Sequence, residues 1–347
     1  MIQTLPIAQF LPAHWQGDNT LIDVRSPQEF EKGHIPGAIN IPLFDDNERA
    51  LVGTLYKRKG RNNALLSGLD IVGPKLGQFV RELQNQSQTK EVLVHCWRGG
   101  MRSQSMGLLW QMAGFRVSTL EGGYKAYRHD VHACFGQKWN IKIIGGSTGT
   151  GKTDILHSLR EAGAQVLDLE GLANHRGSTF GGLGCAEQPS VEQFENDCHE
   201  IMRHYDPSKP LWIEDESHAI GRVYVPTPLW EQMKVAPVYI LDLPYDLRTE
   251  RLIKEYGSYP KLAVNAALLR IKKRLGGKNY QDAIDGVEAD DPQKVVALSL
   301  AYYDKAYSHG LARKDKVQKY HLSLKTDNPA QTAQLLLKQN DTQKTTE

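Results

Sequence analysis

The chain has 347 residues, of which 40% are hydrophobic and 24% charged, and its formal net charge is +2. This length suits two domains with separate cores, and the small net charge excludes a basic coat over the whole surface, although not a local basic face. The N-terminal residues lack the basic segment and apolar core of a signal peptide, and no run of about 18 apolar residues would span a membrane. We therefore expect a cytoplasmic protein.

The first part of the chain alternates short apolar strands with helical segments. Residues 20–24 (TLIDV) and 91–96 (EVLVHC) are typical of buried parallel strands. Helical spacing of apolar residues appears in 72–84 and in 103–115, where Gly114 would end the helix. Residues 116–123 predict another strand and a turn. This pattern predicts an α/β domain over residues 1–130, with its reactive loops at the carboxyl ends of strands.

The second part of the chain repeats this alternation. After an expected linker at 129–139, strand-like runs follow at 140–146, 164–170, 210–216 and 236–244. Because helical segments separate them, they predict a second parallel sheet. We expect this domain to cover residues 138–325, with a helical, basic C-terminal part from about residue 247, and residues 326–347 to form a polar, frayed tail.

The loop after residues 91–96 is the first candidate site. Cys96 and Arg102 are separated by five residues, between a strand and a helix. Backbone N–H groups and the helix N-terminus would face the Cys96 sulfur and favour its thiolate. A lone cysteine is more often a buried core residue, but the neighbouring arginines and glycines favour a reactive thiolate beside an anion site. The candidate residues of this loop are Cys96, Trp97, Arg98, Gly99, Gly100, Met101 and Arg102.

This loop resembles the rhodanese family, together with the segments LIDVRSPQEFEKGHIPGAINIP (21–42) and LEGGYKAYR (120–128). The resemblance covers about residues 5–130. It implies that Cys96 accepts a chalcogen atom as a covalent intermediate. Sulfur-carrying rhodaneses generally have four residues between the cysteine and the arginine. The five found here match the rhodanese-like phosphatases, which implies a phosphate-containing donor. We expect Asp23, Arg25 and His34 to support the scaffold.

Residues 146–153 (GSTGTGKT) form the second candidate site, since they match the phosphate-loop pattern G-x4-G-K-[ST] between a strand and a helix. The loop amides would wrap a diphosphate, Lys152 would neutralise it, and Thr153 could hold Mg²⁺. The spacing does not identify the group attached to the diphosphate. The predicted diphosphate contacts are Gly146, Ser147, Thr148, Gly149, Thr150, Gly151, Lys152 and Thr153, with Arg176 as a further candidate.

Acidic residues follow the run 210–216. Glu214, Asp215 or Glu216 could order Mg²⁺ or water, but a solvated strand end explains each one nearly as well. Hence no firm metal site is predicted, with Thr153 and Asp215 as the candidates if Mg²⁺ is used. His175, in the glycine-rich segment 168–182, could be structural.

Two basic clusters favour a large polyanion such as RNA, although a solvated face explains either cluster alone equally well. The first cluster is Lys57, Arg58 and Lys59. The second is Arg270, Lys272, Lys273, Arg274 and Lys278.

The chain also contains, in this order, the segments HCWRGGMRS, GGSTGTGKT, DLEGLANHRGS and WIEDESHAIG. Together they resemble the tRNA 2-selenouridine synthase family, and the resemblance extends to about residue 325. The resemblance implies a rhodanese-like parallel-sheet domain followed by a P-loop NTPase-like α/β domain. It also implies a transferase that acts on tRNA carrying 2-thiouridine at the wobble position. Its co-substrates would be geranyl diphosphate and selenophosphate, with no tightly bound cofactor and with the selenophosphate-producing enzyme as a possible partner.

The implied reaction has two steps. The phosphate loop would hold geranyl diphosphate while the thiocarbonyl sulfur is geranylated, and a selenium atom carried on Cys96 would then replace the geranylated sulfur. Phosphate leaving selenophosphate would bind Arg102 and the loop amides. Cys134, Cys185 or Cys198 could discharge the loaded Cys96. Trp212, Tyr224 and Trp230 are candidates for the geranyl pocket.

Two other functions fit the same motifs. One is an ATP-dependent tRNA sulfurtransferase, which would consume ATP and need no prenyl donor. The other is a P-loop kinase with a regulatory rhodanese-like module, which would keep its full activity without Cys96.

Overall fold

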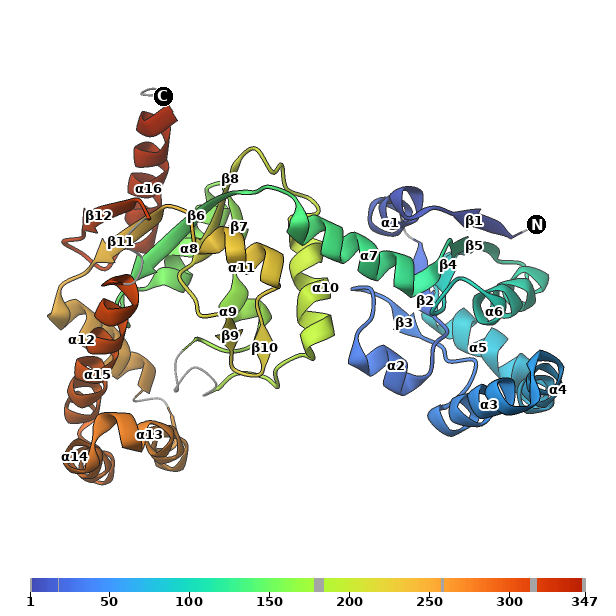
Figure 1. The fold of residues 1–347 in the computed structure, drawn as a ribbon, viewed down its shortest axis with the longest axis horizontal. Coiled ribbons are helices and arrows are strands. Elements are labelled where there is room, and N and C mark those ends of the chain that lie inside the picture. The colour runs from blue at the N-terminus through green and yellow to red at the C-terminus, as the bar shows by residue number, and fades with distance from the viewer. Residues whose placement is uncertain (1, 18, 178–183, 257–258, 313–316, 345–347) are drawn as a thin grey trace. The chain divides into compact units, whose positions relative to one another are not determined.

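The computed structural model describes residues 2–17, 19–177, 184–256, 259–312 and 317–344. The chain divides into two compact units, Met1–Cys134 and Phe135–Glu347. Each unit has a five-stranded parallel sheet with helices packed on it (Figure 1). The predicted α/β class with two parallel sheets is therefore confirmed.

The sheet of the first unit has the strand order β1-β5-β4-β2-β3. Its strands are β1 (Gln3–Leu5), β2 (Thr20–Asp23), β3 (Ile39–Asn40), β4 (Glu91–His95) and β5 (Arg116–Leu120). Its helices are α1 (Ile7–Gln16), α2 (Pro27–Lys32), α3 (Asp46–Lys59), α4 (Arg61–Val72), α5 (Leu76–Gln86), α6 (Met101–Met112) and α7 (Gly123–Gly136), with a 3₁₀ turn η1 (Gly73–Lys75) before α5. Because β4 is central, the loop after it opens at the middle of the sheet edge.

The linker expected at 129–139 is mostly helical. Residues 129–136 continue α7, and Val131 and Phe135 have no exposed surface. Most residues of this segment are polar, but its two buried apolar residues are four positions apart and so share one face of a helix. The boundary between the two units, at Cys134 and Phe135, falls within the segment expected to link them, but the segment is largely a helix.

The second unit is built on the strand order β12-β11-β6-β8-β7, with a small hairpin of β9 and β10. Its strands are β6 (Asn140–Gly146), β7 (Gln165–Leu167), β8 (Pro210–Glu214), β9 (Ala219–Ile220), β10 (Val223–Tyr224), β11 (Val238–Asp242) and β12 (Lys319–Ser323). Its first helices are α8 (Lys152–Glu161), α9 (Leu169–Leu172), α10 (Val191–Met202) and α11 (Thr227–Met233). Strand β6 lies at the centre and leads into the phosphate loop.

Four helices follow β11: α12 (Tyr245–Tyr256), α13 (Lys261–Leu275), α14 (Gly277–Glu288) and α15 (Pro292–Ala312). These helices are drawn in Figure 1. They share an apolar core that includes Leu252, Leu268 and Leu300. The helical C-terminal region expected from residue 247 is therefore present.

The polar tail expected at 326–347 contains a helix from Pro329 to Lys344. Helix α16 (Pro329–Lys344) follows β12, and its Ala333 and Leu336 are buried in the core beside α8. Strand β12 pairs in parallel with β11 and thereby places α16 against the sheet. The prediction failed because only one narrow face of this helix is apolar.

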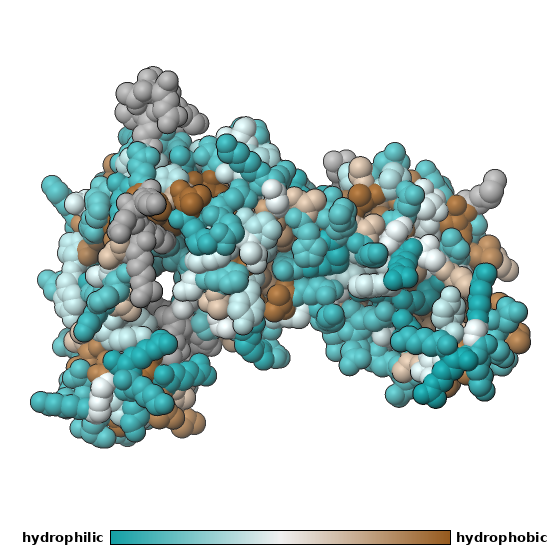
Figure 2. Space-filling model, in the orientation of Figure 1, coloured by the Kyte–Doolittle hydropathy of each residue, from teal (hydrophilic) through white to brown (hydrophobic). Residues whose placement is uncertain are grey.

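In the part of the chain that the structure describes, no helix is both long and apolar enough to cross a membrane. Hydrophilic residues cover most of the face drawn in Figure 2, and hydrophobic residues appear there in small patches.

Candidate functional site

The Cys96 loop is clamped by close backbone contacts with the turn that follows β5. Gly99 has φ +64°, and a Cβ on it would lie 2.5 Å from the Leu120 carbonyl oxygen. On the other side, a Cβ on Gly123 (φ +61°) would lie 2.3 Å from the Cys96 carbonyl oxygen. The Tyr124 N–H donates to this same oxygen at 2.8 Å. Glycine is therefore required at both positions.

The Cys96 sulfur lies beneath the loop, and the residue is only 3% exposed. Its Sγ is 3.3 Å from Ser103 Oγ, and the Ser103 hydroxyl donates to the Gly100 carbonyl at 3.1 Å. Trp97, Arg98 and Met101 are exposed around it. The Cys96 side chain is therefore almost closed off from solvent in this structure.

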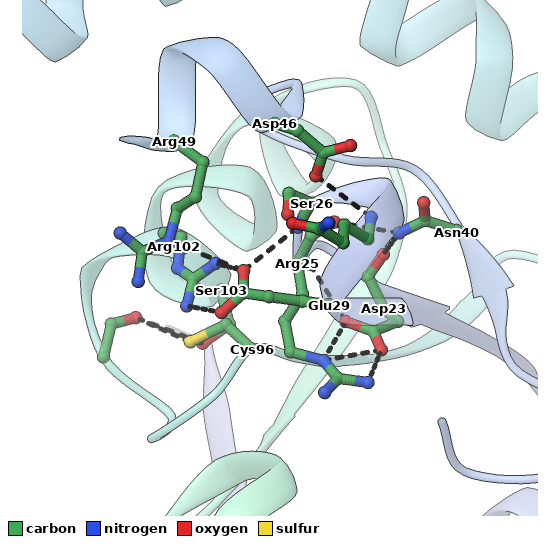
Figure 3. Close-up of polar contacts among 12 residues, drawn as sticks. Asp23, Arg25, Ser26, Glu29, Asn40, Asp46, Arg49, Cys96, Arg102 and Ser103 are labelled. Carbon is green, nitrogen blue, oxygen red and sulfur yellow. Dashed lines mark hydrogen bonds and ion pairs between the residues drawn. The ribbon is translucent and has the colours of Figure 1, made fainter. Parts of the chain in front are cut away.

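Arg102 is held by an ion pair (Figure 3). Its Nη1 lies 2.6 Å from Glu29 Oε2, and its Nη2 lies 3.4 Å from Glu29 Oε1. Burial raises the pKa of Glu29, but the hydrogen bond and charge of Arg102 outweigh it and hold that pKa below its usual range. Arg49 lies 3.5 Å from the same carboxylate. Because Glu29 is 73 residues away from Arg102 in sequence, the spacing of residues in the loop motif could not predict this ion pair.

Three buried polar residues support the loop from below. Arg25 makes a bidentate pair with Asp23, and its guanidinium carbon lies 3.7 Å from the centre of the Tyr124 ring. His95 lies 3.7 Å from Asp23. Nearby, His34 Nδ1 lies 3.0 Å from the Phe30 carbonyl. These contacts fit the scaffold role expected of Asp23, Arg25 and His34.

The phosphate loop joins β6 to α8. Gly149 and Gly151 have φ values of +84° and +74°, which bend the loop around the N-terminus of α8. Lys152 Nζ donates to the Gly146 carbonyl at 3.1 Å, and the Thr153 hydroxyl donates to Glu170 Oε2 at 3.2 Å. Such a loop directs backbone amides at an anion beside a lysine.

Two arginines of α12 support the phosphate loop. Arg248 donates to the Thr148 carbonyl at 3.1 Å and pairs with both carboxylate oxygens of Asp304. Arg251 is held by Asp154 and Asp327, and its guanidinium lies against Gly151. The sequence did not connect these two arginines with the phosphate loop, because their partners are 56 to 100 residues away.

A cavity of about 1560 Å³ opens over the phosphate loop. Arg176, Trp230 and Cys185 line it, and Arg176 Nη1 donates to the Tyr259 hydroxyl at 3.0 Å. Two residues expected at a geranyl pocket lie elsewhere. Trp212 is 1% exposed in the sheet core, and Tyr224 is exposed outside the cavity lining.

Three carboxylates gather between the phosphate loop and the end of β8. The Glu170 N–H donates to Glu214 Oε1 at 2.8 Å, and Glu170 also accepts from Thr153. Burial, followed by nearby carboxylates, raises the pKa values of Glu214 and Glu216 well above the usual range. Among the described residues, no group of three or more histidines, cysteines and acids has the arrangement of a metal site.

Both basic clusters are exposed on helices. Lys57, Arg58 and Lys59 form the last turn of α3. In the second cluster, Arg270, Lys272, Lys273 and Arg274 lie on α13 and Lys278 on α14. Burial and the charge of Arg270 lower the pKa of His175, a cavity residue. Of this cluster, Arg270 therefore lies near enough to His175 for its charge to act on the ring.

The fold and the two loops define a two-domain enzyme with a rhodanese-like and a P-loop domain. The model of the rhodanese-like domain matches residues 8–130, and that of the tRNA 2-selenouridine synthase AAA domain matches residues 139–335. The chain belongs to the tRNA 2-selenouridine synthase family.

Individual relatives match over most of the chain. The tRNA 2-selenouridine synthase of Shewanella frigidimarina (strain NCIMB 400) is 35% identical over 330 residues, covering 85% of this chain and 89% of that protein. The one of Psychromonas ingrahamii is 33% identical over 333 residues, covering 86% and 90%.

Proposed function

We propose that the chain converts 2-thiouridine at the tRNA wobble position to 2-selenouridine, by S-geranylation followed by selenation. One observation carries the proposal: a complete phosphate loop and a clamped Cys-x5-Arg loop occupy separate units of one chain. Two anion sites suit two phosphorylated donors, geranyl diphosphate and selenophosphate. Membership of the family supports tRNA as the substrate.

In the first step, the loop 146–153 holds the diphosphate of geranyl diphosphate. The thiocarbonyl sulfur of the base attacks the allylic carbon, and the carbon–oxygen bond breaks as pyrophosphate leaves. Lys152 and the loop amides stabilise the leaving charge. Arg176 and Trp230 line the same cavity, so the first would contact the diphosphate and the second the isoprenoid chain. Thr153 and Asp215 offer oxygen ligands if Mg²⁺ accompanies the diphosphate.

In the second step, the Cys96 thiolate attacks the selenium of selenophosphate, and the electron pair of the Se–P bond stays on phosphorus, which leaves as phosphite toward the loop amides 97–101. The terminal selenium of the loaded cysteine then attacks C2 of the base as geranylthiol departs. A second thiol breaks the remaining S–Se bond, which leaves selenium on the base and a disulfide on Cys96. Arg102 would release Glu29 and bind the phosphate group of the donor, because a guanidinium forms bidentate hydrogen bonds with a phosphate as well as with a carboxylate.

The residues that would contact tRNA are the two basic clusters. The α13 cluster includes Arg270, whose charge acts on the cavity residue His175, so the cluster would hold the RNA backbone near the phosphate loop. A transient contact with the selenophosphate-producing enzyme would supply the second donor. We propose no tightly bound cofactor.

The test is a comparison of Cys96→Ala and Lys152→Ala on thiolated tRNA, with mass analysis of the nucleosides. Cys96→Ala should still form S-geranylated uridine but no 2-selenouridine. Lys152→Ala should lose geranylation. Equal loss of both steps in Cys96→Ala would contradict this division of labour. Activity that requires ATP but no prenyl donor would favour the sulfurtransferase, and unaltered phosphoryl transfer in Cys96→Ala would favour the kinase.

A further inference from the structure

One side of the helix α15 forms part of the lining of the cavity over the phosphate loop. The α15 residues in this lining are Tyr303, Ala306, Tyr307, Gly310 and Leu311. Because they follow one another at helical spacing, with three or four residues to each turn, they lie on the same side of the helix. None of the five carries a charge, so this side of α15 suits the apolar part of a ligand.

Contacts along α15 show which part of the helix lies at the phosphate loop. Asp304 pairs with Arg248, which also donates to the Thr148 carbonyl in the loop. One turn further along α15, the Tyr307 hydroxyl oxygen lies 2.8 Å from the position of a Cβ on Gly145, which directly precedes the loop. The segment from Asp304 to Tyr307 is therefore beside the place where a diphosphate would bind.

Beyond Tyr307, α15 leads away from the phosphate loop. The Leu311 carbonyl accepts from Lys319 Nζ at 3.0 Å, and Lys319 is the first residue of β12. Strands β12, β11 and β6 are parallel, and the phosphate loop follows the end of β6, so the start of β12 lies at the opposite edge of the sheet. Gly310 is about 9 Å beyond Asp304 along the helix axis. The apolar side of α15 therefore extends from the diphosphate site toward that far edge.

Gly310 leaves space in the cavity at this distal part of α15. A Cβ on Gly310 would meet no atom of the described residues within 4 Å. The residue belongs to the helix α15, and its φ is not in the positive range that only glycine tolerates well. A larger side chain at this position would therefore extend into the cavity without straining the backbone.

We propose that this side of α15 binds the isoprenoid chain of the donor and that Gly310 sets the longest chain that the cavity accepts. The inference rests on the proposed geranylation. With the diphosphate in the loop 146–153, the chain passes Tyr307 and ends near Gly310 and Leu311. Trp230 of α11 lines the same cavity. Contact with these uncharged side chains removes the apolar chain from water, which favours a ten-carbon donor over a five-carbon one.

The test compares geranyl diphosphate with dimethylallyl diphosphate as donors to thiolated tRNA, with the full chain. Gly310→Leu should lower geranyl transfer and retain transfer of the five-carbon group, because the leucine side chain would occupy the space of the last carbons of the longer chain. The ratio of the two kcat/KM values should change by about 10- to 100-fold. His309→Leu is the control, since His309 is an exposed residue of α15 outside the cavity lining, and it should keep the wild-type ratio.

A second variant should change donor preference in the opposite direction, which a damaged fold would not do. Leu311→Ala should improve transfer from the fifteen-carbon farnesyl diphosphate relative to geranyl diphosphate. The inference is overturned if the wild type geranylates tRNA and neither variant changes its donor preference. It is also overturned if Gly310→Leu lowers transfer from the ten-carbon and five-carbon donors equally. In both cases the proposed geranylation stands. If the wild type transfers no isoprenoid group, the proposed function itself fails.

Discussion

His95 directly precedes Cys96 on β4, and its side chain is completely buried beside Asp23. Burial lowers the pKa of His95 to about 4, although the Asp23 charge opposes this shift. The ring is therefore neutral at physiological pH. A neutral ring under the loop leaves Arg25 as the only cation that pairs with Asp23 in the described contacts.

This burial makes the stability of the first unit depend on pH. The unfolded His95 binds a proton below about pH 6.5, whereas the folded one does so only below about 4. Because the unfolded state binds more protons in this window, the free energy of unfolding should fall by roughly 3 kcal/mol as the pH drops through it. Calorimetry of the full chain would follow the transition of this unit. His95→Gln should flatten the dependence between pH 4 and 6.5, whereas the exposed His132→Gln should not.

At this scale, the sequence predicted residues whose chemistry lies in a contiguous motif. Cys96 and Lys152 were assigned to candidate sites from their immediate neighbours. The partners of the loops were missed, because Glu29 reaches Arg102 and Arg248 reaches Thr148 only through the tertiary fold. Trp212 was a candidate for the geranyl pocket, but its position on the interior strand β8 buries it in the sheet core.

Among the elements, the turn from β4 to α6 is tightly constrained, because its backbone passes within contact distance of the turn after β5. Gly99 and Gly100 are adjacent in it but differ in surroundings. A Cβ on Gly99 meets the Leu120 carbonyl, whereas one on Gly100 meets nothing within 4 Å. Gly100 also has a negative φ of −98°.

These two glycines provide a matched pair for a stability measurement. Gly99→Ala should destabilise the first unit by about 1–3 kcal/mol, from the strained φ and the close carbonyl. Gly100→Ala should change its stability by less than about 1 kcal/mol. Thermal unfolding of both variants gives the comparison. Equal destabilisation would show that the clamp on Gly99 does not shape the loop.

Elements with strong periodicity or clear end signals were predicted well, as for β4, β6 and α8. The helix α16 and the strand β12 were not predicted, since they contain few apolar residues. Their positions are set by the packing of α16 on α8 and the pairing of β12 with β11. Helix α7 was taken for a linker for a related reason: its buried residues are separated by histidines and charged residues.

At the scale of the whole molecule, the net charge is only +2, yet basic residues are concentrated on α13 and α14. If tRNA lies there, replacing Arg270, Lys273 and Lys278 by glutamine should weaken binding. It should also reduce the slope of log affinity against log salt by up to about 3, near 0.9 per lost phosphate contact. Binding titrations at several salt concentrations measure both effects. The control replaces the exposed Lys294, Lys305 and Lys325, which should leave the slope unchanged if the α13 cluster is the RNA site.

The division of the chain into two units predicts complementation between variants. Each loop and its described supports lie within one unit: Glu29 and Gly123 with Cys96, and Arg248 and Glu170 with the phosphate loop. A Cys96→Ala chain should therefore geranylate tRNA, and a Lys152→Ala chain should selenate that product. Mixing the two variants with thiolated tRNA and both donors should restore 2-selenouridine, although neither variant forms it alone. Failure of the mixture, with S-geranylated tRNA accumulating, would mean that the intermediate must stay on the chain that made it.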